Sequence, residues 1–148
     1  MGYVENSLLK DETIIYKTKL HKIIFFWPGF IFIFSIFFIA IAKNDSDEET
    51  MAGFFLLVGI IWFINALIRY LTSEFAITNK RIIIKVGLIK RITLEMNREK
   101  IESIGVDQGI LGRIFNYGTI VISGTGSTKQ IFKAIVNPIQ FRKIAQEK

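Results

Sequence analysis

The stretch Gly124-Thr-Gly-Ser-Thr-Lys129 is the part of the chain that comes nearest to a phosphate-binding loop. A dinucleotide fingerprint needs a third glycine near the position of Lys129, and a P-loop needs a glycine directly before its lysine. Both motifs also run from a strand into a helix, whereas this stretch joins two predicted strands. We interpret it as a hairpin connection, and we expect no nucleotide or other cofactor.

Side chains that catalyse reactions are scarce. The chain has no cysteine and one histidine, His21, which excludes disulfides, zinc–thiolate sites, iron–sulfur clusters, a cysteine nucleophile and a multi-histidine metal site. His21 has no nucleophile or carboxylate beside it in the sequence. Glu95, Glu99 and Glu102 lie among lysines and arginines, where surface ion pairs account for them. The sequence therefore predicts a protein that is not an enzyme and binds no metal.

Positive charge is concentrated in the second half of the chain. Residues 69–148 carry fourteen Lys and Arg against six acids, while the whole chain has a net charge of +6. Two interpretations stay open: an ordinary solvated face, or a surface that contacts anionic lipid headgroups or a protein partner. Aromatic residues interleaved with the basic ones are too few for a nucleic-acid site. The candidate contact residues are Lys80, Arg81, Lys85, Lys90, Arg91, Arg98 and Lys100.

The location of these basic residues depends on two uncharged runs in the first half of the chain. Residues 23–42 and 51–68 contain no charged side chain, and Lys22 and Arg69 border them on the outer sides. A helix needs about 20 apolar residues to cross a bilayer, so the runs predict a transmembrane hairpin with an outer turn at 43–50. A cleaved signal peptide would be shorter and nearer the N-terminus, and a buried soluble hairpin would not leave both runs without charge.

The charges beside the runs predict their orientation. Lysines precede the first run and basic residues follow the second, while the turn between them is acidic, which places both termini in the cytoplasm. Asn65 is the one amide in the second run and could hydrogen-bond between helices. Neither run holds an ionisable residue, which argues against a pump. The expected membrane-interface anchors are His21, Lys22, Trp27 and Arg69.

Alternating apolar and polar residues predict strands on both sides of the hairpin. They are expected at residues 13–17, 75–78, 81–86, 91–97, 101–107, 119–123 and 130–136, with a bulge or bend near 103–105. Asn137 and Pro138 should begin a C-terminal helix, with Asn137 as its N-cap. Residues 108–118 are too rich in glycine for more than one helical turn. That turn is expected to pack Ile110, Leu111, Ile114 and Phe115 inward.

Several of these segments resemble the bacterial pleckstrin-homology-like (PH) domain family. The segments are 77–81, the apolar residues 82–86 with Gly87-Leu-Ile, 100–104, 109–113 and 117–119, together with 12–16 and His21. The nearest resemblance is to small membrane proteins with two spans before one such domain. It implies a bent β sandwich or barrel capped by a C-terminal helix, in the bacterial inner membrane. It names no ligand, because a fold does not specify a task.

The expected protein is therefore an α+β membrane protein with one PH-like domain. Residues 1–22 would form a cytoplasmic segment with a possible strand, 23–71 the transmembrane hairpin, and 72–148 the cytoplasmic domain. The expected function is that of a non-enzymatic, membrane-anchored binding or scaffold module that contacts lipid headgroups or an unknown protein partner. Copies of the chain could also associate with one another. The alternative is a subunit of an oligomeric channel or transport-associated complex, with Asn65 or Ser35 facing its axis.

Overall fold

The chain folds into two compact units. The computed structural model describes residues 2–41, 46–126 and 129–147, without the side chains of 46–49. One unit, the β unit, comprises Met1–His21 and Thr72–Lys148, and the other, the helical unit, comprises Lys22–Leu71. The N-terminal segment therefore belongs to the same compact unit as the C-terminal strands, although the whole helical unit separates them in the sequence.

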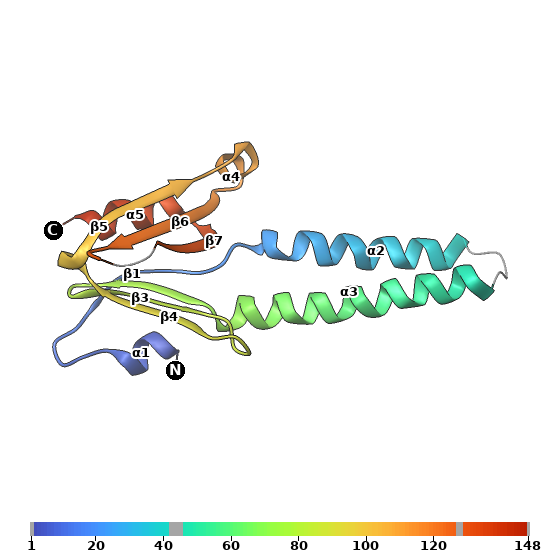
Figure 1. Cartoon of the computed structure of the whole chain (residues 1–148), viewed down its shortest axis with the longest axis horizontal. Helices are drawn as coiled ribbons and strands as arrows, with labels where there is room; N and C mark the ends of the chain where they lie inside the picture. Colours follow the sequence, from blue (N-terminus) through green and yellow to red (C-terminus); the bar gives the residue numbers. More distant parts are fainter. Residues whose placement is uncertain (1, 42–45, 127–128, 148) are drawn as a thin grey trace. The chain divides into compact units, whose positions relative to one another are not determined.

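The first sheet of the β unit combines both ends of the chain. Its strands are β1 (Ile14–Thr18), β2 (Glu74–Thr78), β3 (Arg81–Val86) and β4 (Ile92–Asn97), antiparallel in the order β1-β2-β3-β4 (Figure 1). The alternation in β3 explains its two faces. Ile82 and Ile84 are fully buried, whereas Arg81 and Lys85 are half-buried on the opposite face.

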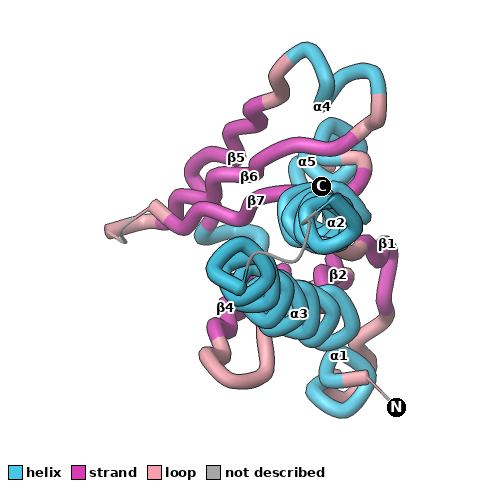
Figure 2. The backbone as a smooth tube through the Cα atoms, turned by 90° about the vertical axis from the view of Figure 1, so that its right-hand side faces the viewer, coloured by secondary structure: helices cyan, strands magenta, loops and turns pink. Residues whose placement is uncertain are grey.

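The second sheet consists of β5 (Ile101–Asp107), β6 (Tyr117–Gly124) and β7 (Gln130–Val136), which lie side by side in Figure 2. A register shift between Ile101 and Ser103 agrees with the irregularity expected near this point. Residues 124–129 connect β6 to its antiparallel partner β7, as the hairpin interpretation predicted, and 127–128 lie outside the described residues. A bridge between Leu20 and Ile135 joins the N-terminal segment to this sheet.

The two sheets form an open sandwich with one helix at its end. The short 3-10 helix η2 (Arg98–Lys100) links β4 to β5, which are both edge strands, so the described strands do not close into the barrel that was the other expected form. Helix α5 (Pro138–Gln146) contacts strands of both sheets. Phe141 is its fully buried anchor, with its ring centroid 6.4 Å from that of Tyr16.

Asn137 does not cap α5 as expected, although Pro138 is the first helical residue. An N-cap residue normally has an extended backbone that points its side chain at the first free amides. Asn137 instead has a left-handed backbone (φ 50°, ψ 55°) and makes no capping hydrogen bond. The turn from β7 into α5 requires this conformation, which asparagine tolerates better than most residues.

A small second core covers the outer face of the first sheet. Helix α1 (Tyr3–Ser7) places Val4 against Ala76 and Ile83, and all three side chains are fully buried. This packing explains why Ile83 is buried even though it points away from the other sheet. The N-terminal segment is thus a structural layer of the β unit.

The predicted inward packing of helix α4 (Ile110–Ile114) is wrong. Gly112 is the buried residue of this turn. A Cβ atom there would lie 2.6 Å from the carbonyl oxygen of Tyr117, so the close approach requires glycine. The Gln108 side-chain amide also donates to that oxygen at 2.9 Å. The turn therefore docks through glycine and backbone, and its large apolar side chains are left exposed: Ile110 at 80%, Leu111 at 58%, Ile114 at 68% and Phe115 at 55%.

The helical unit contains η1 (Lys22–Phe25), α2 (Phe26–Ile41) and α3 (Ser46–Thr72). By length and composition, Lys22–Ile41 and Thr50–Thr72 could each cross a membrane, and most of their side chains are exposed. Helix α3 begins at Ser46, inside the expected outer turn, and residues 42–45 lie outside the described part of the chain. Gly59 lets the helices approach closely, since a Cβ atom there would lie 3.4 Å from the Cα atom of Phe32.

Candidate functional site

The β unit has two ends with different chemistry. At one end, which we call the connection end, the chain passes into the helical unit after His21 and returns before Ser73. The loop from Gly87 to Arg91 and helix α4 also lie at this end (Figure 1). At the other, the far end, lie the turn between β2 and β3, η2 and the last turn of α5. The length of β3 separates them by about 17 Å, at about 3.3 Å per residue.

The structure divides the seven candidate basic residues between these ends. Three of them (Lys85, Lys90 and Arg91) lie toward the connection end, and four (Lys80, Arg81, Arg98 and Lys100) lie toward the far end. The seven residues therefore do not form one continuous basic surface. Each group has to be judged by its own contacts.

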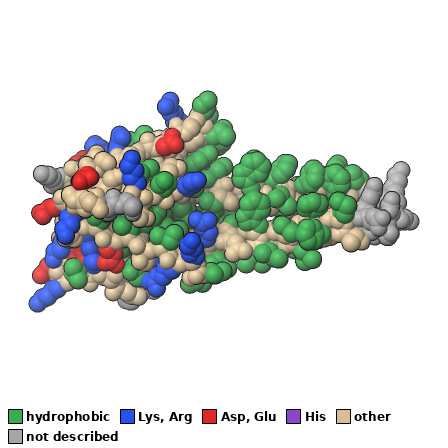
Figure 3. Space-filling model, viewed as in Figure 1, with side chains coloured by type: hydrophobic (Ala, Val, Ile, Leu, Met, Phe, Trp, Pro, Cys, Tyr) green, Lys and Arg blue, Asp and Glu red, His purple; other side chains and the backbone are tan. Residues whose placement is uncertain are grey.

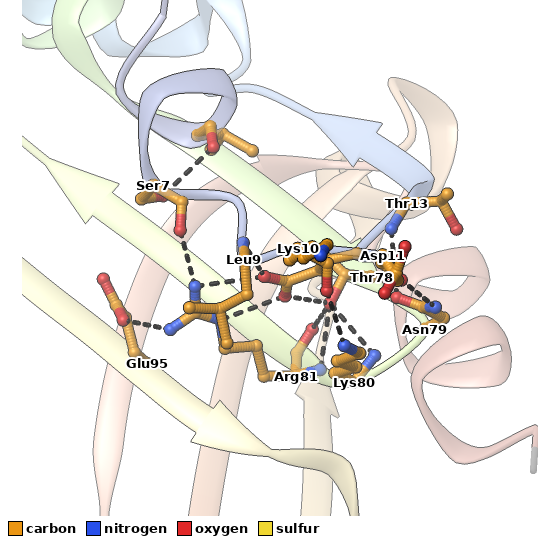
Figure 4. A network of polar contacts seen from close by, with 12 residues as sticks. Ser7, Leu9, Lys10, Asp11, Thr13, Thr78, Asn79, Lys80, Arg81 and Glu95 are labelled. Carbon is orange, nitrogen blue, oxygen red and sulfur yellow. Dashed lines mark hydrogen bonds and ion pairs between the residues drawn. The ribbon is translucent and has the colours of Figure 1, made fainter.

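Arg81 is committed to an internal network rather than to a ligand (Figure 4). Its Nε and Nη2 atoms donate to the two carboxylate oxygens of Glu12 at 3.0 and 3.1 Å, and Nη1 donates to Glu95 at 2.6 Å. Nη2 also donates to the carbonyl oxygen of Ser7 at 2.6 Å. Its side chain is 13% exposed and that of Glu12 is 0% exposed, so the pair is shielded from water.

Every partner of Glu12 favours its ionised form. Burial alone raises the pKa of Glu12, but the carboxylate accepts hydrogen bonds from Arg81, from the Leu9 amide at 2.7 Å and from the Thr78 hydroxyl at 2.7 Å. The net result is a pKa below the ordinary glutamate value, while bonding to Glu12 raises the pKa of Arg81. The ion pair therefore fastens the N-terminal segment to the turn between β2 and β3 at neutral pH.

A second set of contacts holds α1 on the sheet. The Glu74 carboxylate accepts the backbone N–H groups of Tyr3 and Val4 at 2.9 and 3.1 Å, at the start of α1 where such groups lack helical partners. The guanidinium carbon of Arg91 lies 4.5 Å from the centre of the Tyr3 ring, and Lys85 Nζ lies 5.2 Å from it. Lys85 and Arg91 thus have cation–π contacts that stabilise α1.

The far end carries an open groove of about 1010 Å³. Lys80 and Arg98 border it, and each donates to a carbonyl oxygen, of Lys10 and Ile144 respectively, at 2.9 Å. The walls mix both charges with amides and a few apolar side chains. The lining residues are Leu9, Asn79, Lys80, Arg81, Asn97, Arg98, Glu99, Ile101, Glu102, Ala145, Gln146 and Glu147.

The groove can bind through hydrogen bonds and ion pairs. Among residues 2–41, 46–126 and 129–147, no group of three or more His, Asp or Glu side chains is placed to hold a metal ion. The lining contains both carboxylates and cations, which suits a ligand carrying both donors and acceptors.

Comparison with known proteins identifies the family of this chain. A model of the bacterial PH domain family matches residues 28–147. The chain belongs to the bacterial PH domain family. The match spans α3, strands β2 to β7 and α5, whereas β1 lies before it. Domains of this type are generally non-catalytic binding modules. Neither a search of curated proteins nor a search of solved structures returned a match.

In this PH-domain protein, the expected membrane anchors have different surroundings. The His21 ring stacks on Tyr117 with centroids 4.9 Å apart, and its backbone N–H donates to the Ala134 carbonyl oxygen at 2.6 Å. His21 therefore has a defined structural role at the connection end. Lys22, Trp27 and Arg69 are exposed, and their anchoring role stays a prediction.

Asn65 bonds within its own helix, since its side-chain nitrogen donates to the Ile61 carbonyl oxygen at 2.9 Å. The hydroxyl of Ser35 likewise donates to the Ile31 carbonyl oxygen at 2.8 Å. Neither of these two bonds crosses between the helices. An interhelical contact through Asn65 stays a prediction.

Sequence reasoning missed the residues that hold the N-terminal layer of the PH domain. These are Tyr3, Glu12 and Glu74, which act through partners more than sixty residues away. The one available signal was Glu12, which lies in a segment that carries the family resemblance. Its buried partners could not be read from the neighbouring residues.

Proposed function

We propose that this protein is a membrane-anchored, non-enzymatic binding module. Helices α2 and α3 cross the bacterial cytoplasmic membrane, both termini lie in the cytoplasm, and the PH domain holds a protein partner in the far-end groove. The spans of 20 and 23 residues would be about 30 and 35 Å long at 1.5 Å per residue, enough for a hydrocarbon core of about 30 Å.

The observation that carries the proposal is the two-ended form of the β unit. Both chain connections, after His21 and before Ser73, lie at one end, and the groove lies at the other. Two short tethers keep the connection end at the bilayer surface. The groove is then about 17 Å of strand away from that surface, which favours a cytoplasmic protein over a headgroup of the same bilayer.

The chemistry of the groove supports the same choice. A site for a lipid phosphate would be lined mainly by cations, whereas Glu99, Glu102 and Glu147 share this groove with the basic residues. Edge strands β4 and β5 end and begin beside it, and such edges accept extended peptides by strand addition. A polar protein segment in extended form is therefore the proposed ligand.

The channel alternative gains no support from the helical unit. A pore would need Asn65 or Ser35 to face its axis, and each of these side chains donates to a carbonyl oxygen of its own helix. We therefore retain the binding module alone.

The orientation can be tested with a reporter fused after Lys148. We expect the reporter to be cytoplasmic, because the basic flanks of the two spans should stay inside. A fusion placed in the acidic connection at residue 45 should report the opposite side and serves as the matched control. A periplasmic signal from the Lys148 fusion would contradict the proposed topology.

The groove can be tested by site-specific photo-crosslinking of the full chain in native membranes. A crosslinking residue in place of Glu102, an exposed groove residue, should give one discrete protein adduct. The adduct should become several-fold weaker when Glu99→Lys reverses a charge in the groove, since Glu99 is exposed and its loss leaves the Arg81 network intact.

The matched control is the same crosslinking residue in place of Lys133, which is exposed on β7 outside the groove. It should not give the adduct seen at position 102. Adducts with lipid alone at position 102, or identical protein adducts at both positions, would refute the groove as the partner site.

A further inference from the structure

Two apolar tips project from the connection end of the β unit, one from each sheet. The first tip is the loop Gly87–Arg91 between β3 and β4, where Leu88 is 60% and Ile89 is 80% exposed. The second is α4 with Phe115, whose four large apolar side chains are exposed as described above. In Figure 3 hydrophobic side chains gather at the tip formed by α4. Folded proteins rarely leave such clustered apolar surface uncovered.

Both tips are held in place, so their exposure does not come from loose ends of the chain. Gly87 has a φ of 79°, and a Cβ atom there would lie 2.6 Å from the Lys90 carbonyl oxygen, so only glycine permits this tight loop. The second tip is fixed by Gln108, which donates to the carbonyl oxygens of Gly112 at 3.2 Å and of Tyr117 at 2.9 Å.

Each tip is also fastened next to one of the two chain connections. The Gly87 N–H donates to the Ser73 hydroxyl at 3.3 Å, directly after the end of α3. Tyr117, two residues beyond Phe115, stacks on His21, directly before the first apolar helix. The exposed apolar residues are therefore tied to the two points at which the chain continues into helices that could span a bilayer.

The remaining side chains of the tips are basic. Lys90 and Arg91 follow Ile89, and Arg113 lies within α4, while neither tip contains an acid. Lys90 and Arg113 are both exposed. Apolar residues next to cations are the composition of segments that lie in the interface of an anionic bilayer.

We infer that Leu88–Ile89 and the apolar face of α4 insert into the headgroup–acyl boundary of the leaflet in which α2 and α3 end. This inference rests on the membrane anchoring proposed above. It adds a monotopic contact that fixes the connection end on the lipid surface and leaves the far-end groove facing the cytoplasm. A second copy of the chain or another protein would not require cations at both tips.

The absence of cysteine from the chain allows a clean test. Ile89→Cys and Ile110→Cys would each be labelled with a fluorophore in the full chain, reconstituted in vesicles of phosphatidylethanolamine and phosphatidylglycerol. We expect both probes to be quenched by spin-labelled lipid and protected several-fold from aqueous iodide. Ile131→Cys on β7 is the control, since Ile131 is also an exposed isoleucine, at 58%, but lies away from the connection end. It should be quenched by iodide and not by lipid.

Iodide quenching at positions 89 and 110 equal to that at 131 would overturn the inference. Protection from iodide without quenching by lipid would also overturn it, because a protein surface would then cover the tips. Flotation of the same vesicles separates this outcome from failure of the proposed function. A chain that does not float with lipid refutes the membrane anchoring, whereas a chain that floats with exposed tips refutes the inserted tips alone.

Discussion

Replacing Arg81 with methionine should destabilise the β unit by about 3–5 kcal/mol, because it leaves the buried Glu12 carboxylate without its charged partner. The Glu12 side chain is 0% exposed, and two of its hydrogen bonds come from Arg81. The same change removes the donors to Glu95 and to the Ser7 carbonyl oxygen. The N-terminal segment would lose its main attachment to the turn between β2 and β3.

Hydrogen exchange of the β2 and β3 amides, measured by mass spectrometry on the full chain in detergent, would report this local opening without the contribution of the helices. Lys85→Met on the same strand is the control. Its cation–π contact with Tyr3 should contribute about 0.5–1 kcal/mol at such a site. Equal effects of the two substitutions would refute a special role for Arg81.

The double variant Glu12→Leu with Arg81→Met separates the cost of an unpaired charge from the value of the pair. Removing both partners of a buried pair is usually far less damaging than removing one. We therefore expect the double variant to be more stable than Arg81→Met alone. A double variant as unstable as the sum of both single changes would mean that Glu12 and Arg81 act independently.

The same pair gives the β unit a defined response to acid. The pKa of Glu12 in the folded chain lies below its ordinary value of 4.5. Its contribution to stability is therefore complete above about pH 4.5 and is lost as the pH falls from there through the folded pKa. The double variant should lack this part of the acid sensitivity in the same exchange measurement.

The strands were predictable because their signal is local. In β3, Ile82, Ile84 and Val86 lie on one face and Arg81, Ile83 and Lys85 on the other, and the strand has the predicted bounds. The two long helices were equally predictable, because an uninterrupted apolar stretch of about 18 residues or more is too long for a buried strand and favours a helix. Pro138 likewise marked the start of α5.

The N-terminal layer could not be predicted in this way. Its contacts join residues such as Glu12 and Thr78, which are 66 positions apart, and nothing in the local pattern specifies such a pair. The count of charged residues also gave no reason to separate Arg81, whose side chain is only 13% exposed and serves an internal network, from Lys90 on an exposed loop.

The error at α4 came from an assumption about solvent. Four large apolar residues in one turn were expected to face a protein core, as they would in a water-soluble protein. The structure buries Gly112 instead and leaves those side chains outside. The lipid contact inferred above would give these side chains a second apolar medium, which periodicity alone does not distinguish from a core.

Replacing Phe141 with alanine should destabilise the β unit by about 3–5 kcal/mol, the usual cost of removing a fully buried phenylalanine. Phe141 is 0% exposed on α5, a helix that contacts β1, β2, β5 and β6. Its ring meets that of Tyr16 edge-on. Because α5 contacts strands of both sheets, loss of this buried side chain should raise amide exchange in both of them.

Ile139→Ala on the same helix is the matched control, since Ile139 is 53% exposed and its truncation should change stability by no more than about 0.5 kcal/mol. Phe141→Leu, which keeps most of the volume, should cost less than Phe141→Ala. Flotation with vesicles should persist in all three variants, because the proposed spans lie outside the β unit. Faster exchange confined to α5 after Phe141→Ala would mean that the two sheets hold together without this helix. Contacts between β1 and β7, such as the bond from the Thr18 hydroxyl to the Val136 carbonyl oxygen, would then be what joins the sheets.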